Sequence, residues 1–227
     1  MLMIAERVMA GLREINHLRS LSQKNPDLKA SLALLRPWQA ARLSQTHADL
    51  LTSSRYAKAA RFFLDDIYGP HDFSQRDADL VRIVPAIERL LPQQAIRTVA
   101  HAVELNLLTE LLDHDLALRL PVGLEILTPA QYAQAYAVVE KKNDRIRQIE
   151  LVQLTGQELD KLVRLPLMGS ALRMMRKPAA LAGLSSLQQF LERGFDAFHS
   201  MKGADDFLRL VSERERDLMQ ALFNQSR

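Results

Sequence analysis

Apolar residues recur every three or four positions along almost the whole chain, and this spacing constrains the fold more than any other feature. The interval places them on one face of an α-helix, which can then pack against other helices. Strong helix formers are abundant, glycine is scarce at 8 of 227 residues, and no segment makes a convincing strand. The sequence therefore predicts an all-α fold. The clearest stripe lies in residues 3–24, at Ile4, Val8, Met9, Leu12, Ile15, Leu18 and Leu21.

Proline, glycine and capping residues mark where these helices should begin and end. Residues 25–27 (Asn-Pro-Asp) end the first helix, and Pro37 is expected in the first turn of the second. Thr128 followed by Pro129 predicts a strong helix start, and Thr155 opens a capping-box pattern. Further helices are expected over about 54–68, 92–120, 166–176, 184–200 and 204–223, with Pro85 kinking or splitting the one around it.

These segments amount to nine to eleven helices with short links, which favours one compact multi-helix bundle over residues 1–227. Possible halves, 1–120 and 124–227, would meet near the proline-containing stretch 121–129. Nearly half of the residues are hydrophobic, enough for a sizeable core. No window is long and apolar enough for a transmembrane helix, and no signal-peptide pattern opens the chain, so a cytoplasmic protein is expected.

Composition excludes several classes of function. The chain has no cysteine, which rules out disulfides, thiolate metal sites and a cysteine nucleophile. It also lacks a Walker A loop, a dinucleotide-binding glycine motif, a nucleophile elbow and an HExxH zinc motif. The net charge of +3 is modest, and no dense basic recognition helix is present, so specific nucleic-acid binding is disfavoured.

Charge is unevenly distributed along the chain, and this pattern suggests self-association. Residues 101–160 carry 5 basic and 10 acidic side chains, whereas the segments on either side are each net positive by four. The segment 161–177 is basic and amphipathic, has no acidic residue, and contains several methionines that adapt to irregular partners. It is a candidate surface for a protein partner, with the acidic block of a second subunit favoured, and a homodimer is expected. The alternative is a core-facing stripe with a solvated basic back.

The most distinctive local feature is the run from Arg61 to Asp77, RFFLDDIYGPHDFSQRD. Its aromatic residues should be buried around a helix–loop–helix corner at Gly69-Pro70, while Asp72 caps the next helix and Asp77 meets its dipole. Arg76 or Arg82 should pair with neighbouring acids. The alternative hypothesis is a site for a hard cation in this acidic cluster, which includes Asp79 and His71. The motif residues are Phe62, Phe63, Asp65, Asp66, Tyr68, Gly69, Pro70, Asp72, Phe73, Arg76 and Asp77.

Three carboxylate–histidine pairs with a three-residue step could supply a metal site between helices, because that step puts both side chains on one helix face. A haem ligated by a helical histidine such as His47, His101 or His199 is a further possibility. Bridging carboxylates are not identifiable, so no cofactor is expected and separate surface positions are favoured for the pairs. They are Glu14 with His17, His101 with Glu104, and Asp196 with His199.

The run over residues 56–77, YAKAARFFLDDIYGPHDFSQRD, resembles a family of uncharacterised bacterial proteins, helical, cytoplasmic and of similar length. The similar part covers roughly residues 45–90, with a weaker likeness elsewhere. The resemblance implies a domain of unknown function and no particular activity. We therefore expect a non-enzymatic protein that acts through a helical interaction surface. The alternative is a helical-bundle oxidoreductase or ligand-binding protein that uses metal or haem.

Overall fold

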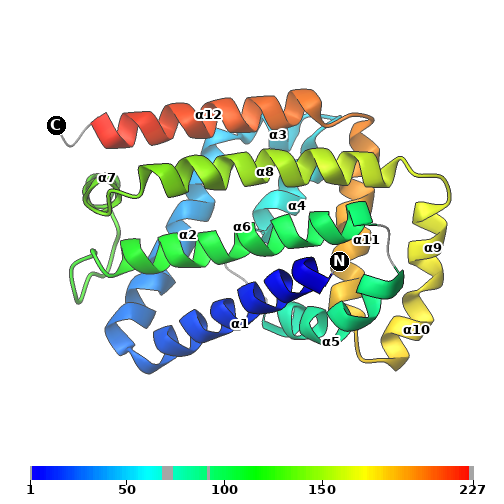
Figure 1. The fold of residues 1–227 in the computed structure, drawn as a ribbon. Coiled ribbons are helices and arrows are strands. Elements are labelled where there is room, and N and C mark those ends of the chain that lie inside the picture. The colour runs from blue at the N-terminus through cyan, green and yellow to red at the C-terminus, as the bar shows by residue number, and fades with distance from the viewer. Residues whose placement is uncertain (1, 68–73, 91–92, 225–227) are drawn as a thin grey trace.

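The computed structural model describes residues 2–67, 74–90 and 93–224, and within these ranges the chain contains helices and no strand, which confirms the all-α prediction (Figure 1). The segment η1 is one turn of π-helix that continues α4 directly. The elements are α1 (Leu2–Lys24), α2 (Pro26–Thr46), α3 (Ala48–Thr52), α4 (Ala57–Phe62), η1 (Phe63–Ile67), α5 (Ser74–Leu90), α6 (Gln93–Ala117), α7 (Pro129–Val138), α8 (Lys142–Val163), α9 (Met168–Met174), α10 (Arg176–Leu181), α11 (Ser185–Met201) and α12 (Asp205–Asn224).

Three long helices, α6, α8 and α12, lie side by side and form one layer of the bundle (Figure 1). Helix α1 packs against α6, α5 and α2, while α11 packs against α4, α5 and α8. Helices α9 and α10 lie at one edge of the molecule (Figure 1). Helices from the two expected halves pack on one another, as α6 does on α8 and α4 on α11.

Local capping explains several helix starts. The side chain of Asn25 accepts a hydrogen bond from Leu28 N at 3.1 Å, and Pro26 occupies the first turn of α2. At α7 the expected start is confirmed, because Thr128 and Gln131 form a complete capping box. The starts of α2 and α7 are therefore set by residues that neighbour them in sequence.

Two predicted boundaries were wrong. Pro37 lies inside α2 rather than at a helix start, because α2 carries one continuous apolar face formed by Leu32, Leu35 and Trp38. Thr155 lies inside α8 and caps nothing, and its buried hydroxyl has no hydrogen-bond partner among the described residues. In both cases packing of a long helix overrode a local signal. The helix around Pro85 runs from Ser74 to Leu90 without a break.

The apolar core consists of separate clusters rather than one continuous mass. One cluster joins α2, α6, α7 and α12 around Trp38 and Tyr132, whose rings stack with centroids 4.1 Å apart. Another joins α3, α4, η1, α11 and α12 around Phe198 and Phe207. Polar and charged side chains lie between these clusters, and they surround a cavity.

Candidate functional site

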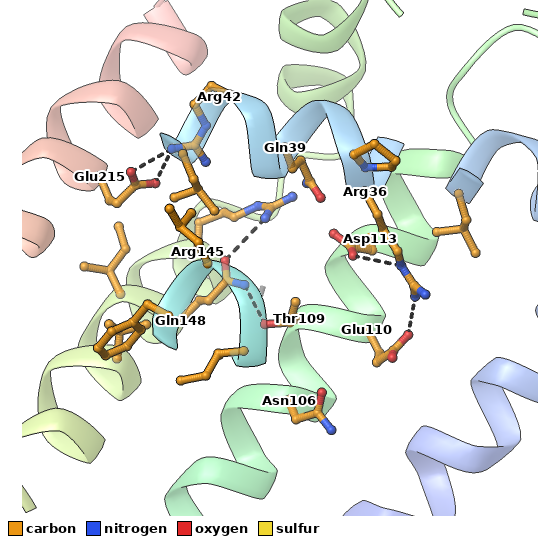
Figure 2. A pocket seen from close by; sticks show the side chains of 18 of the residues that line it. Arg36, Gln39, Arg42, Asn106, Thr109, Glu110, Asp113, Arg145, Gln148 and Glu215 are labelled. Atoms are coloured by element: carbon orange, nitrogen blue, oxygen red, sulfur yellow. Dashed lines mark hydrogen bonds and ion pairs between the residues drawn. The ribbon is translucent and has the colours of Figure 1, made fainter. Parts of the chain in front are cut away.

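A cavity of about 760 Å³ lies within the bundle, between α1, α2, α6, α8, α12 and η1 (Figure 2). Its volume falls in the range of pockets that hold small molecules. Its wall is unusually charged for the interior of a small helical protein, because four arginines and three carboxylates line it. These residues are Arg19, Arg36, Arg42, Arg145, Glu110, Asp113 and Glu215.

One group of ion pairs connects the distinctive motif to this cavity. Asp77, buried at 2% exposure in the first turn of α5, accepts hydrogen bonds from Arg76 at 2.9 Å and from Arg19 at 3.0 Å. Asn106 on α6 also donates to Asp77, at 3.3 Å. Asp77 therefore fixes the guanidinium of Arg19 at the cavity wall. The prediction that Arg76 pairs with a neighbouring acid is confirmed.

The chain of charges continues across the cavity (Figure 2). Arg19 Nε donates to Glu110 at 2.8 Å, and Arg36 donates to the second oxygen of Glu110 at 2.6 Å. Arg36 Nε lies 3.5 Å from Asp113, which is buried and has Gln39 beside it. Each carboxylate in this chain thus has a guanidinium partner, as buried charges require.

Arg145 on α8 differs from the other arginines of the cavity. Its side chain is buried, yet none of the carboxylates in the described ranges lies within 4.0 Å of its guanidinium. Its polar contact is a hydrogen bond of 3.3 Å to Gln148, which in turn donates to Thr109 at 2.8 Å (Figure 2). The guanidinium also lies over the ring of Tyr136, 4.6 Å from its centroid. Arg145 acts on the carboxylate of Asp113 through space but forms no direct ion pair, so this position favours an anion.

A further ion pair of the cavity joins α2 to α12. Arg42 Nη1 donates to both oxygens of Glu215 at 2.7 Å, and His47 Nε2 lies 3.1 Å from one of them. Three buried polar atoms of cavity-lining residues have no hydrogen-bond partner among the described residues: Arg42 Nε, His47 Nδ1 and Ser212 Oγ. Such atoms are rare in folded proteins and often mark a ligand or water site.

The ionisation of these groups follows from burial and charge. Burial raises the pKa of Asp113, which Glu110 also raises and which Arg36 and Arg145 oppose. Burial likewise raises the pKa of Tyr136 to about 12, so its hydroxyl stays neutral and does not offset Arg145. For Glu215, burial raises the pKa, but His47 and Arg42 outweigh burial and the net effect lowers it.

The cavity also has an apolar wall, which η1 and two long helices form. Phe63 and Ile67 reach it from η1, and both are partly exposed although they belong to the interior. Val152 of α8 and Val211 of α12 complete this wall. A π-helical turn often marks a functional site, because its extra residue re-aims the side chains around it. The wall as a whole is amphipathic, because a belt of charged residues is flanked by apolar ones.

The motif residues play several parts around this site. Phe62 is buried, as predicted, while Phe63 is only partly buried and packs between Phe198 and Phe207. Asp66 accepts a hydrogen bond from Arg193 at 2.9 Å, and Asp65 is exposed. The predictions for Tyr68, Gly69, Pro70, His71, Asp72 and Phe73 lie outside the described residues.

The six carboxylate and histidine residues singled out as metal ligands are not brought together. Within the described ranges, no group of three or more histidine, aspartate or glutamate side chains is placed to hold a metal ion. Glu14 and His17 are exposed on α1, and Asp196 and His199 are exposed on α11. His101 instead pairs with Glu158 at 2.9 Å, and Glu104 accepts from Arg147 at 2.8 Å. The three-helix metal arrangement is therefore not formed.

The basic segment 161–177 lies largely outside the core. Leu167 and Met174 are 80% and 78% exposed, and no residue of α9 is buried. The core-facing alternative for this stripe is therefore wrong. Two of its basic residues are paired within the chain, Arg164 with Asp160 and Arg176 with Glu192.

Sequence reasoning did not single out the cavity arginines or Glu110, Asp113 and Glu215 as one site. On their own helices these residues look like ordinary surface charges, and their partners are distant in sequence: 91 positions separate Arg19 from Glu110 and 173 separate Arg42 from Glu215. One feature of the sequence could have revealed them: these charged residues lie on helix faces that are otherwise apolar. Glu110 and Asp113 follow one another at helical spacing beside the buried Leu112 and Leu116.

Comparison with known proteins gives a family but no characterised relative. Neither the curated proteins nor the solved structures contain a significant match. No helix in the described part of the chain combines the length and the apolar character needed to cross a membrane. A family model matches residues 18–227, which include the motif and every charged residue of the cavity. The chain therefore belongs to the family described as a domain of unknown function, DUF8198.

Proposed function

We propose that this protein binds a small amphipathic anion inside its helical bundle. The observation that carries the proposal is Arg145, a buried guanidinium on the wall of a 760 Å³ cavity with no carboxylate of the described residues within 4.0 Å. Buried charges in proteins are normally paired. An anionic group in the cavity would supply the missing partner and would also meet polar atoms of Gln148 and Thr109.

The sequence suggested, as an alternative function, a helical-bundle protein that binds a ligand with the help of metal or haem. We keep ligand binding and leave out the metal and the haem. Support comes from the rest of the wall, because Arg42, His47 and Ser212 carry buried polar atoms without partners among the described residues. Phe63 and Val211, which also line the cavity, offer apolar surface to the body of a ligand. Pockets of this kind combine a mostly apolar lining with a few polar groups that orient the ligand.

Thermal unfolding in the presence of defined ligands tests this function. A ligand that binds only the folded state stabilises it by about 2.7 kcal/mol at one hundred times its Kd. We expect decanoate, decyl phosphate or both to raise the Tm, while decanol, which has no charge, should have a much smaller effect. The Arg145→Gln variant should lose most of the stabilisation by the anion.

Arg147→Gln is the matched control, because Arg147 lies two residues away on the same helix but is exposed and pairs with Glu104. It should respond to the anions as the unaltered protein does. Equal stabilisation by decanol and by the anions, or none by any of them, would contradict the proposal.

A second proposal concerns self-association through the surface of α9 and α10. Leu167, Met174 and Leu181 are strongly exposed there, at 80%, 78% and 90%. Exposed apolar residues gathered on one surface are typical of interaction sites. Basic Arg173 and Lys177 accompany them, and the exposed Glu125 and Glu140 of a second copy offer complementary charge. The proposed assembly is a homodimer.

Light scattering at micromolar concentration and physiological salt tests the dimer. We expect a mass near twice 25.8 kDa for the unaltered chain and near 25.8 kDa for a Leu167→Glu, Met174→Glu variant. A monomer mass for the unaltered chain would contradict the homodimer.

A further inference from the structure

We infer that the ligand is a monocarboxylic acid with an apolar body, bound with its carboxylate at Arg145 and its body along η1. This inference rests on the proposed function and adds the charge, the head group and the orientation of the ligand. Two observations support it. The charged residues of the cavity leave one positive charge in excess, and apolar residues of the wall lie on the side of η1.

The charges of the wall balance except at one position. Arg76 and Arg19 share Asp77, while Arg19 and Arg36 share Glu110, and Asp113 completes this chain of three cations and three anions. Arg42 is matched by Glu215.

With His47 counted as neutral, Arg145 is left as the single excess charge within the cavity. Lys29 also touches the cavity, but it is exposed, so solvent and salt screen its charge. One excess cation is neutralised by a monoanion. A phosphate monoester, which carries up to two charges near neutral pH, would exceed this balance.

The head group should be planar and able to accept two hydrogen bonds. The guanidinium of Arg145 is a planar fork that matches a carboxylate in a bidentate arrangement. Gln148 holds one of its nitrogens at 3.3 Å, which fixes the plane of the fork beside Thr109. Tyr136 covers one face of the guanidinium, so the carboxylate approaches along its edge.

The orientation follows from two antiparallel helices. On α8 the cavity-lining residues change from Arg145 through Gln148 to Val152. On α12 the charged Glu215 lies between Val211 and Phe207 on its N-terminal side and Leu218, Met219 and Leu222 on its C-terminal side. Arg145 lies near α7 because α8 follows α7 in the chain, and α12 packs against α7 through residues beyond Glu215, among them Met219 and Leu222. Val152 and Val211 lie together, farther from α7, as the opposed courses of α8 and α12 show (Figure 1).

The space available for the body can be gauged along α8. Arg145 and Val152 are seven residues apart, which corresponds to about 10 Å of helix. The partly exposed Phe63, Leu64 and Ile67 of η1 face this length of the cavity. On the other side of the charged belt, Tyr132 and Met219 belong to a closely packed cluster and are almost fully buried. An apolar body therefore fits on the η1 side.

Isothermal titration calorimetry distinguishes this inference from the proposed function itself. The probes are decanoate, naphthoate as an aromatic carboxylate, and decyl phosphate. We expect at least one carboxylate to bind with one site per chain and at least about tenfold more tightly than decyl phosphate. Arg145→Gln should weaken that carboxylate about tenfold or more, as the loss of a charge-assisted hydrogen bond implies, and Arg147→Gln should not.

A second variant pair tests the orientation. Val211→Thr places a hydroxyl on the apolar wall with little change of volume and should weaken decanoate several-fold, whereas Val138→Thr, at an exposed site, should leave it unchanged. Circular dichroism checks that each variant is folded.

The outcomes separate the two claims. Tight binding of decyl phosphate with weak binding of both carboxylates would overturn this inference and leave the proposed function standing. If none of the three anions binds, both fall. An equal loss of decanoate affinity in Val211→Thr and Val138→Thr would overturn the orientation alone.

Discussion

At the scale of single residues, Asp113 is a carboxyl of the cavity wall whose pKa is raised. Its carboxyl is buried among Arg36, Arg145 and Glu110, with Gln39 beside it, and its pKa is raised chiefly by burial. A proton taken up there removes one negative charge from the wall. The excess of positive charge that faces a ligand then grows from one to two.

Anion affinity should therefore increase as the pH falls toward the raised pKa of Asp113. The sign follows because protonation removes a repelling carboxylate while the ligand stays ionised, as a carboxylic acid does above about pH 5. Calorimetric titrations of decanoate from about pH 8 downward, over the range in which the ligand stays ionised, measure this effect. In Asp113→Asn, which is neutral throughout, the affinity should vary much less with pH. An equally steep pH dependence in that variant would assign the effect to another group.

Glu215 should be a major contributor to stability, because its carboxylate is the shared partner of buried Arg42 and His47. Glu215→Gln leaves Arg42 unpaired in the interior and should cost about 3–5 kcal/mol in urea unfolding. The control is Glu213→Gln, on the same helix but exposed and paired with Arg209, which should cost about 1 kcal/mol or less. Similar costs for the two variants would show that the buried pair contributes little.

The pH dependence of stability follows from the same carboxylate. Since the pKa of Glu215 is lowered below its ordinary 4.5 by His47 and Arg42 against the effect of burial, its contribution is fully present above that value. It is lost as the pH falls through the folded-state pKa. The unaltered protein should thus lose more stability on acidification below about pH 4.5 than Glu215→Gln does.

At the scale of elements, the cavity depends on a close approach between α8 and α12. Gly156 lies where a Cβ atom would come within 2.4 Å of Leu208 Cδ2, so the two helices pack together there without room for a side chain. Gly156→Ala should force a shift and cost about 1–3 kcal/mol. In the double variant with Leu208→Ala, the costs should be less than additive, measured by urea unfolding. Strict additivity would mean that the two residues do not contact each other.

Two neighbouring phenylalanines meet at the junction of α4 and η1, and one belongs to the core while the other lines the cavity. Phe62 is buried against Phe190 and Gly194, whereas Phe63 is partly exposed at the cavity wall. Phe62→Ala should cost about 3–5 kcal/mol, and Phe63→Ala should cost less because its ring already borders empty space. Phe63→Ala should instead change decanoate affinity. A larger stability loss for Phe63→Ala than for Phe62→Ala would place Phe63 in the core.

At the scale of the whole molecule, the sequence predicted the helices and helix starts that depend on local periodicity and capping. The apolar stripe of residues 3–24 became α1, and the Thr128-Pro129 start became the capping box of α7. Predictions for Pro37 and Thr155 failed because long helices packed through local breaks. The all-α fold could be predicted since helical spacing is a property of neighbours within about four residues.

The cavity could not be predicted in the same way, because it depends on which helices meet. Arg19, Glu110 and Arg36 come from three helices, and no periodic pattern states that α1, α2 and α6 converge. Each charged residue by itself is typical of a solvated helix face. Only the motif pointed toward the site, and it did so through Asp77, which holds Arg19 at the cavity wall, and through Phe63.

The most direct test of the account is a crystal structure of the protein with ω-bromodecanoate, whose bromine marks the end of the chain. The account predicts the carboxylate about 2.7–2.9 Å from the guanidinium of Arg145, with the anomalous signal of bromine beside Phe63 and Val211. Bromine at the exposed surface of α9 and α10, together with an empty cavity, would contradict it.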